Sequence, residues 1–65
     1  MLLEKKSLKE LRARKNKTQQ QVAKDIGVST STYNSWEKYL GNVAISKCIM
    51  LADYYEVPIE VLKIE

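Results

Sequence analysis

The sequence predicts an all-α fold built from short helices, and three local patterns support this prediction. Apolar residues recur at spacings of three and four along most of the chain, as they do on one face of a helix. Ser or Thr precedes several of these stretches, where a hydroxyl can accept a hydrogen bond from the first turn. Gly27, Gly41 and Pro58 interrupt the pattern and mark the ends of short segments.

The first helix is predicted over roughly residues 4–15, with Ser7 and Glu10 as a candidate local cap inside it. Its last turn is basic, which suits the carboxyl end of a helix dipole. Asn16 is expected to follow it in the left-handed conformation. Its inward stripe consists of leucines, namely Leu3, Leu8 and Leu11.

The stretch from Thr18 to Glu37 predicts two short helices joined by a tight turn. Thr18 is the expected N-cap of the first, and Gln21 completes a Thr-x-x-Gln capping box. Gly27 stands where this helix must end at positive φ, and Ser29 caps the next helix, which runs to about residue 38. The inward positions of both helices are apolar or aromatic: Val22, Ala23, Ile26, Val28, Tyr33 and Trp36.

The outward face of the second of these helices carries short polar side chains and one lysine: Thr30, Ser31, Asn34, Ser35 and Lys38. Such groups can reach base edges in a DNA major groove, and Asn34 can pair with adenine through two hydrogen bonds. An ordinary solvent-exposed face is the alternative. The hydroxyl and β-branched residues of the first turns are poor helix formers, which favours contact with bases.

This stretch resembles the helix-turn-helix of the phage Cro and CI repressors, and the likeness extends from about Leu8 to Leu62. The matching positions are Gln19, Val22, Ala23, Gly27, Val28, Tyr33 and Trp36. The resemblance implies a lambda-repressor-like fold of five short helices with the helix-turn-helix in helices two and three. It also implies a transcriptional regulator that binds operator DNA as a dimer, with helix three as the recognition helix.

The resemblance assigns roles to individual residues as well. Thr30, Ser31, Asn34 and Ser35 occupy base-reading positions. Gln19 opens helix two, where a carboxamide can donate to a DNA phosphate with help from the helix dipole. Arg12 and Glu37 match a pair that ties helix one to the recognition helix, so they are expected to form a structural clamp. Further phosphate contacts are expected from flexible lysines, at Lys9, Lys17 and Lys38.

The chain departs from the family pattern after Glu37, because Tyr39 and Ala44 stand where a Gly and a Pro are usual. We therefore expect helix three to extend by part of a turn and to stop at Gly41. Asn42 is then expected to cap helix four or to contact a phosphate.

The carboxyl-terminal segment predicts two more helices. Helix four is expected over about residues 44–55, and Pro58 then leads into a short helix five over about residues 59–63. The predicted inward stripe of helix four is Ile45, Cys48, Ile49, Leu51 and Ala52.

Length and composition narrow the function further. The 65 residues fit one helix-turn-helix domain over residues 1–65. The net charge is +3, with +5 in residues 1–33 and −2 in residues 34–65, a distribution that suits one face turned toward phosphate. With no histidine and only Cys48, the chain offers no disulfide, no zinc site and no nucleophile–base pair. We expect no enzyme activity, cofactor, metal or small-molecule effector.

These observations predict a transcriptional regulator that binds double-stranded DNA, and we expect a repressor that binds a two-fold symmetric operator as a homodimer. We expect a complete cytoplasmic chain of bacterial or phage origin, because no apolar run is long enough for a bilayer or a signal peptide. Candidate dimer surfaces are the apolar ends, 1–3 and 61–64, with Tyr54 or Tyr55. The alternative is a protein-interaction module of the same fold, of antitoxin or antirepressor type, with a contact surface at Tyr39, Leu40, Val43 and the same apolar ends.

Overall fold

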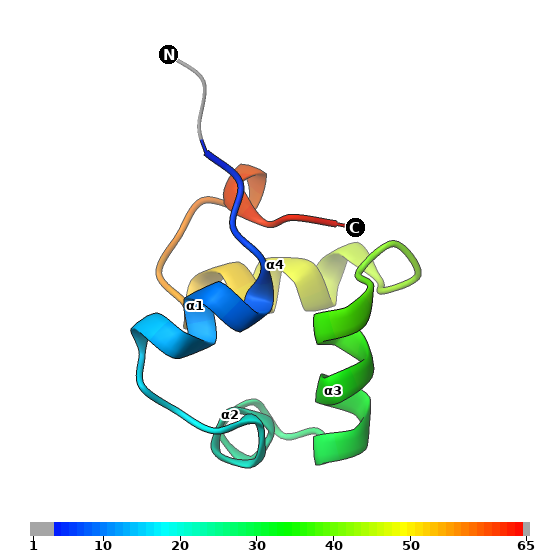
Figure 1. Cartoon of the computed structure of the whole chain (residues 1–65). Helices are drawn as coiled ribbons and strands as arrows, with labels where there is room; N and C mark the ends of the chain where they lie inside the picture. Colours follow the sequence, from blue (N-terminus) through cyan, green and yellow to red (C-terminus); the bar gives the residue numbers. More distant parts are fainter. Residues whose placement is uncertain (1–3, 65) are drawn as a thin grey trace.

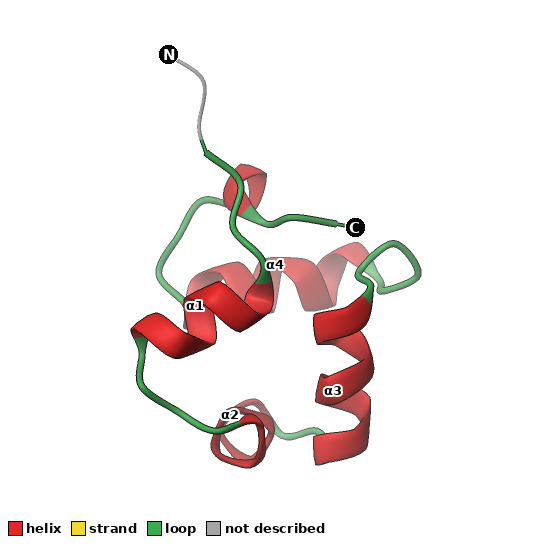
Figure 2. Ribbon diagram, viewed as in Figure 1, coloured by secondary structure: helices red, strands yellow, loops and turns green. Residues whose placement is uncertain are grey.

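The computed structural model describes residues 4–64, which form four α-helices and one 3-10 turn (Figures 1 and 2). The elements are α1 (Leu8–Arg14), α2 (Gln19–Ile26), α3 (Thr30–Lys38), α4 (Ile45–Tyr54) and η1 (Ile59–Val61). The all-α prediction is confirmed. The predicted fifth helix is instead the single 3-10 turn η1, and Leu3 of the predicted leucine stripe lies outside the described residues.

Short side chains fix where the first three helices begin. Ser7, Thr18 and Ser29 are the N-caps, and each hydroxyl accepts from the backbone N–H three residues later. The boxes predicted at Ser7 and Thr18 are both complete. The box at Ser7 starts α1 at residue 8, so the prediction that this helix begins near residue 4 is wrong.

Left-handed residues follow α1, α2 and α4. Gly27 has a φ of 80° and Asn16 a φ of 57°, which confirms both predictions. Glu56 follows α4 with a φ of 58°, which was not predicted. After it, the Val57 N–H donates to the carbonyl of Ala52, so the end of α4 has the Schellman pattern.

The loop after α3 differs from the prediction that helix three extends to Gly41 and that Asn42 can cap helix four. The α3 helix does not reach Gly41, because Tyr39 is already extended, with a φ of −164°. Leu40 then enters the core with 2% of its surface exposed, and its N–H donates to the carbonyl of Ile64. Asn42 does not cap α4, since its N-cap is Ala44 and no side chain caps it.

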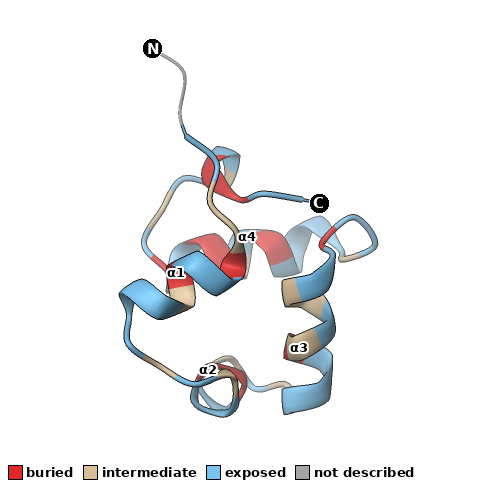
Figure 3. Cartoon of the chain, in the orientation of Figure 1, coloured by how far each residue is buried: buried red, intermediate tan, exposed pale blue. Residues whose placement is uncertain are grey.

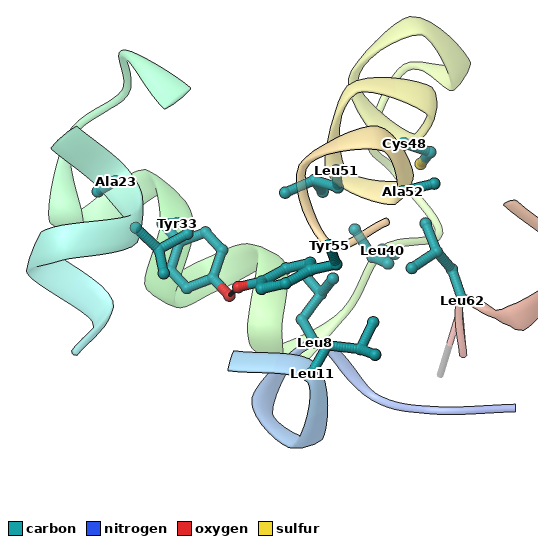
Figure 4. Packing of buried hydrophobic residues seen from close by; sticks show 11 residues of the cluster. Leu8, Leu11, Ala23, Tyr33, Leu40, Cys48, Leu51, Ala52, Tyr55 and Leu62 are labelled. Atoms are coloured by element: carbon teal, nitrogen blue, oxygen red, sulfur yellow. Dashed lines mark hydrogen bonds between the residues drawn. The ribbon is translucent and has the colours of Figure 1, made fainter. Parts of the chain in front are cut away.

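The core lies where α1, α3 and α4 meet, and it continues to α2 and the carboxyl-terminal segment (Figures 3 and 4). Its largest fully buried side chains are Tyr33, Leu8, Leu51, Leu62 and Val22. In Figure 4 the hydroxyls of Tyr33 and Tyr55 face each other, and they share a buried hydrogen bond of 2.5 Å. This pair links α3 to the end of α4 through a polar contact inside an otherwise apolar core.

The structure corrects the predicted burial of two groups of apolar residues. Ile45 and Ile49 were placed in the core, but they are 67% and 47% exposed, while Cys48, Leu51 and Ala52 are buried as predicted. Conversely, four residues suggested as surfaces for a second protein are buried in the single chain: Leu40, Tyr55, Val61 and Leu62.

The carboxyl-terminal segment lies beside the segment that precedes α1. The Lys6 N–H donates to the carbonyl of Val61, and the Lys63 N–H donates to the carbonyl of Lys6. These two bonds pair the segments in parallel at Lys6 and Leu62. They hold Leu62 in the core and leave Ile64 at the surface, 46% exposed.

Candidate nucleic-acid interface

The outer face of α3 is polar and exposed, while its inner face is anchored in the core. Tyr33 is fully buried and Trp36 is partly buried against the core. On the opposite side, Thr30, Ser31 and Ser35 are exposed (Figure 3). A helix held by its aromatic face in this way presents its hydroxyl groups on a rigid element.

The hydroxyls on this face differ in how far they are already engaged. Ser35 donates to the Thr32 carbonyl at 2.8 Å, so its proton is used within the helix and its oxygen can still accept. Within residues 4–64, no side-chain hydrogen bond engages the hydroxyls of Thr30 and Ser31. Those two hydroxyls are therefore available both to donate and to accept.

Asn34 is partly buried, and it is tied to the first residue of α2. Its Nδ2 donates to Oε1 of Gln19 at 3.1 Å. Gln19 in turn donates from Nε2 to Oε1 of Glu37 at 2.9 Å. Two predicted DNA-contacting amides are thus part of one hydrogen-bond chain, which sequence spacing did not indicate.

The ion pair between Arg12 and Glu37 lies at the inner end of this chain. Arg12 Nε donates to Oε2 of Glu37 at 2.6 Å, and Nη2 lies 3.4 Å from Oε1. The side chains are 19% and 7% exposed, respectively. A third contact, from Arg12 Nη1 to the Lys17 carbonyl at 3.0 Å, ties the pair to the loop before α2. Three elements meet at this pair: α1, α2 and α3.

The electrostatics keep this pair ionised. Burial alone would raise the pKa of Glu37, but hydrogen bonds from Arg12 and Gln19 outweigh it, and the pKa lies below its usual value. The hydrogen bond with Glu37 likewise raises the pKa of Arg12. At neutral pH the carboxylate is therefore an acceptor for every hydrogen bond it makes.

The predicted phosphate contacts are distributed unevenly. Lys9 and Lys38 are exposed on α1 and at the end of α3, and Asn42 is exposed in the loop that follows. Lys17 instead forms an ion pair with Asp25 at 2.7 Å, and Tyr54 donates to the same carboxylate oxygen. The structure therefore does not gather these groups into one cluster.

A hollow of about 710 Å³ opens where the loop before α2 approaches the start of α3. Four predicted site residues line it, namely Arg12, Lys17, Gln19 and Thr30. Its full lining is Arg12, Ala13, Asn16, Lys17, Thr18, Gln19, Gln20 and Thr30. Asn16 and Gln20 were not predicted as site residues, because only the fold brings their side chains to this opening.

The described part of the chain has neither a cluster of metal-ligating side chains nor a helix that could span a membrane. Over residues 4–64 no three metal-ligating side chains gather together. None of the helices in this range has the length and apolar character needed to cross a bilayer.

Comparison with known proteins adds one finding. A family model described as helix-turn-helix matches residues 8–62, the range over which the resemblance had been seen. No curated protein and no solved structure matched the chain. The matched family is a DNA-binding one and is generally non-enzymatic. Since the match covers most of the 65 residues, the chain belongs to the helix-turn-helix family of the Cro/CI type.

Proposed function

We propose that this chain is a sequence-specific transcriptional repressor that inserts α3 into the major groove of double-stranded DNA. In this proposal Thr30, Ser31, Asn34 and Ser35 contact base edges. It acts in the cytoplasm as one domain, without a small-molecule effector. The observation that carries the proposal is the exposed polar face of α3, held against α1 and α2 by a continuous chain of hydrogen bonds.

Candidate phosphate contacts near both ends of α3 fit the insertion of this helix into the major groove. The hollow beside the start of α2 is lined by Gln19 and Thr30, and the backbone N–H groups of the first turn of α2 lie in the same region. A phosphate is favoured there, because a helix amino terminus carries partial positive charge. Lys38 can contact a second phosphate from the other end of α3.

A homodimer on a two-fold symmetric operator is the second part of the proposal. One recognition helix contacts only a few base pairs, so two half-sites about one helical turn apart, roughly 34 Å, provide the specificity that a single domain lacks. Because Val61 and Leu62 are buried in the single chain, the dimer contact must use other residues. Large apolar side chains remain exposed at Tyr39, Ile45, Ile49 and Ile64.

The same exposed apolar residues favour a second candidate function, a protein-interaction module of antitoxin or antirepressor type. Tyr39 and Ile64 line a hollow together with Lys5 and Lys63, and this hollow lies outside the α2–α3 region. A protein partner bound there would not need the polar face of α3. Substitutions on α3 therefore separate the two functions.

Selection from a random duplex DNA library, at about 150 mM salt to suppress non-specific binding, tests the proposal. We expect a symmetric motif with two half-sites. The double variant Ser31→Ala, Asn34→Ala should lose the motif while keeping its helical circular dichroism. Ser46→Ala, an exposed serine on α4, is the matched control and should keep it. No enriched sequence from folded protein would reject DNA recognition and favour the protein partner.

A further inference from the structure

We propose that Glu37 acts through Gln19 as a positioning residue that decides which end of the Asn34 amide faces the DNA base. This inference rests on the proposed function and adds to it a determinant of sequence specificity that never touches DNA. It predicts that one oxygen atom in the interior of the domain selects the base at one operator position.

The first step is that Glu37 can only accept hydrogen bonds. Its carboxylate is only 7% exposed and is held by Arg12 at 2.6 Å. An ionised carboxylate has no proton to donate, so any neighbour that forms a hydrogen bond with it must be the donor.

The second step carries this direction to Gln19. A carboxamide has one donor end and one acceptor end. Since Nε2 of Gln19 must face Glu37, at 2.9 Å, its Oε1 is the atom that faces Asn34, one turn earlier on α3. A free glutamine would have no such preference, because its amide can rotate by half a turn.

The third step fixes Asn34. With an acceptor in front of it, Asn34 must turn Nδ2 toward Gln19, and the observed contact is 3.1 Å. Its Oδ1 and the second N–H of Nδ2 stay available. The atom pointing away from Gln19 is then an acceptor, which suits a base with a donor in the major groove. Cytosine has such a donor, and adenine can also accept the remaining N–H at N7.

One isosteric substitution should reverse the whole chain. In Glu37→Gln, the new side chain must keep its oxygen at the Oε2 position, where Arg12 Nε donates at 2.6 Å, and it gives up the longer 3.4 Å contact between Oε1 and Nη2. Its NH2 group then faces Gln19, which rotates, and Asn34 rotates in turn. Nδ2 now points away from Gln19, and the favoured bases become those with acceptors only, guanine and thymine.

The experiment compares sequence preferences, not affinities alone. Binding to the selected operator and to its single-base variants is measured for the wild type, Glu37→Gln, Asn34→Ala and the double variant. The position at which Asn34→Ala loses preference identifies the contacted base pair. There we expect the wild type to favour adenine or cytosine by about fivefold to hundredfold, the usual range for one base contact. Glu37→Gln should favour guanine or thymine there, and it should change nothing at this position when Asn34 is already alanine.

Two results would overturn the inference while leaving the proposed function intact. One is a Glu37→Gln variant that binds more weakly but keeps the wild-type base preference. The other is an Asn34→Ala variant that loses preference at no position, which would make Asn34 only a brace for Gln19. A wild type without any preferred sequence would instead reject the proposed function itself.

A second variant covers the case in which Glu37→Gln does not fold. Gln19→Met keeps the Arg12–Glu37 pair but removes the acceptor that holds Asn34. Overall affinity is expected to fall as well, because Gln19 also contacts phosphate in the proposed function. The informative result is that discrimination between adenine and guanine is lost only at the operator position that Asn34 contacts. Retained discrimination there would contradict the inference.

Discussion

At the scale of single residues, Glu37 is under the strongest constraint. Its carboxylate is nearly buried, yet it is surrounded by donors from two other helices, Arg12 of α1 and Gln19 of α2. A charge in such a place is tolerated only while its partners remain, because removal of one partner leaves the other charge desolvated and unpaired.

Arg12→Ala should therefore destabilise the fold by about 3 kcal/mol or more. Lys9→Ala, which removes an exposed lysine from the same helix, should change stability by less than about 0.5 kcal/mol. Urea unfolding followed by Trp36 fluorescence measures both, and equal midpoints for the two variants would contradict the clamp.

The pH dependence of the stability difference between wild type and Arg12→Ala is the control for this prediction. The pKa of Glu37 is lowered in the folded state, so the stability it provides is present above its ordinary pKa of 4.5 and is lost as the pH falls through the folded value. Without Arg12, the buried carboxylate costs free energy until it is protonated. The stability gap between wild type and Arg12→Ala should thus be largest near neutral pH and narrow below about pH 4.5. A constant gap would point to lost packing instead.

At the scale of helices, the capping residues of α1 and α2 could be predicted because the signals are local, although α1 was expected to begin before its cap at Ser7. Ser7 and Thr18 each form a capping box within four residues of chain, and Gly27 needs only its own backbone freedom. Glu56 adopts a similar left-handed φ without a residue type that favours it, so no local pattern indicated it.

The α4 helix shows where helical periodicity fails. Seven of its ten residues, those other than Ser46, Lys47 and Asp53, are apolar or tyrosine, so more than one face could serve as the inner one. The choice depends on which face the neighbouring segments cover. One side of α4, with Cys48, Leu51 and Ala52, belongs to the core that also contains Leu40, Leu62 and the leucines of α1. Ile45 and Ile49 lie on another side and stay exposed.

Gly27→Ala tests the turn between α2 and α3. A Cβ at this position would meet no atom within 4 Å, so the cost comes from the left-handed backbone alone, at a φ of 80°. We expect a loss of about 1–2 kcal/mol in thermal or urea unfolding. Gly27→Asn should lose less, because asparagine tolerates this conformation better than alanine. Equal losses for the two variants would mean that tolerance of the left-handed conformation does not set the cost.

At the scale of the whole molecule, the sequence predicted the outer face of α3 and, through the family resemblance, its clamp to α1, but not its link to α2. Helical spacing places Thr30, Ser31 and Ser35 outward from Tyr33 without knowledge of other elements. The chain from Arg12 through Glu37 and Gln19 to Asn34 joins three helices, and it exists only once α1 and α2 have packed against α3. Spacing along the sequence does not contain that information.

The fold also shows which of the predicted phosphate-binding lysines are already paired within the chain. Lys17 was expected to contact phosphate, but its ammonium is paired with Asp25 and also lies 5.9 Å from the ring centre of Tyr54. Lys38 has no ion-pair partner among residues 4–64 and stands at the end of the recognition helix. A count of lysines therefore overestimates the number of cations available to DNA.

Lys38→Ala should consequently change how the affinity for operator DNA depends on salt. Each phosphate contact contributes about 0.9 to the slope of log K against log salt concentration, because it releases condensed counterions. We expect the slope of Lys38→Ala to be smaller by about that amount, with the preferred sequence unchanged. Lys47→Ala, on α4, should keep the wild-type slope. Equal slopes for both variants would place Lys38 away from the DNA backbone and require a different orientation of α3 in the groove.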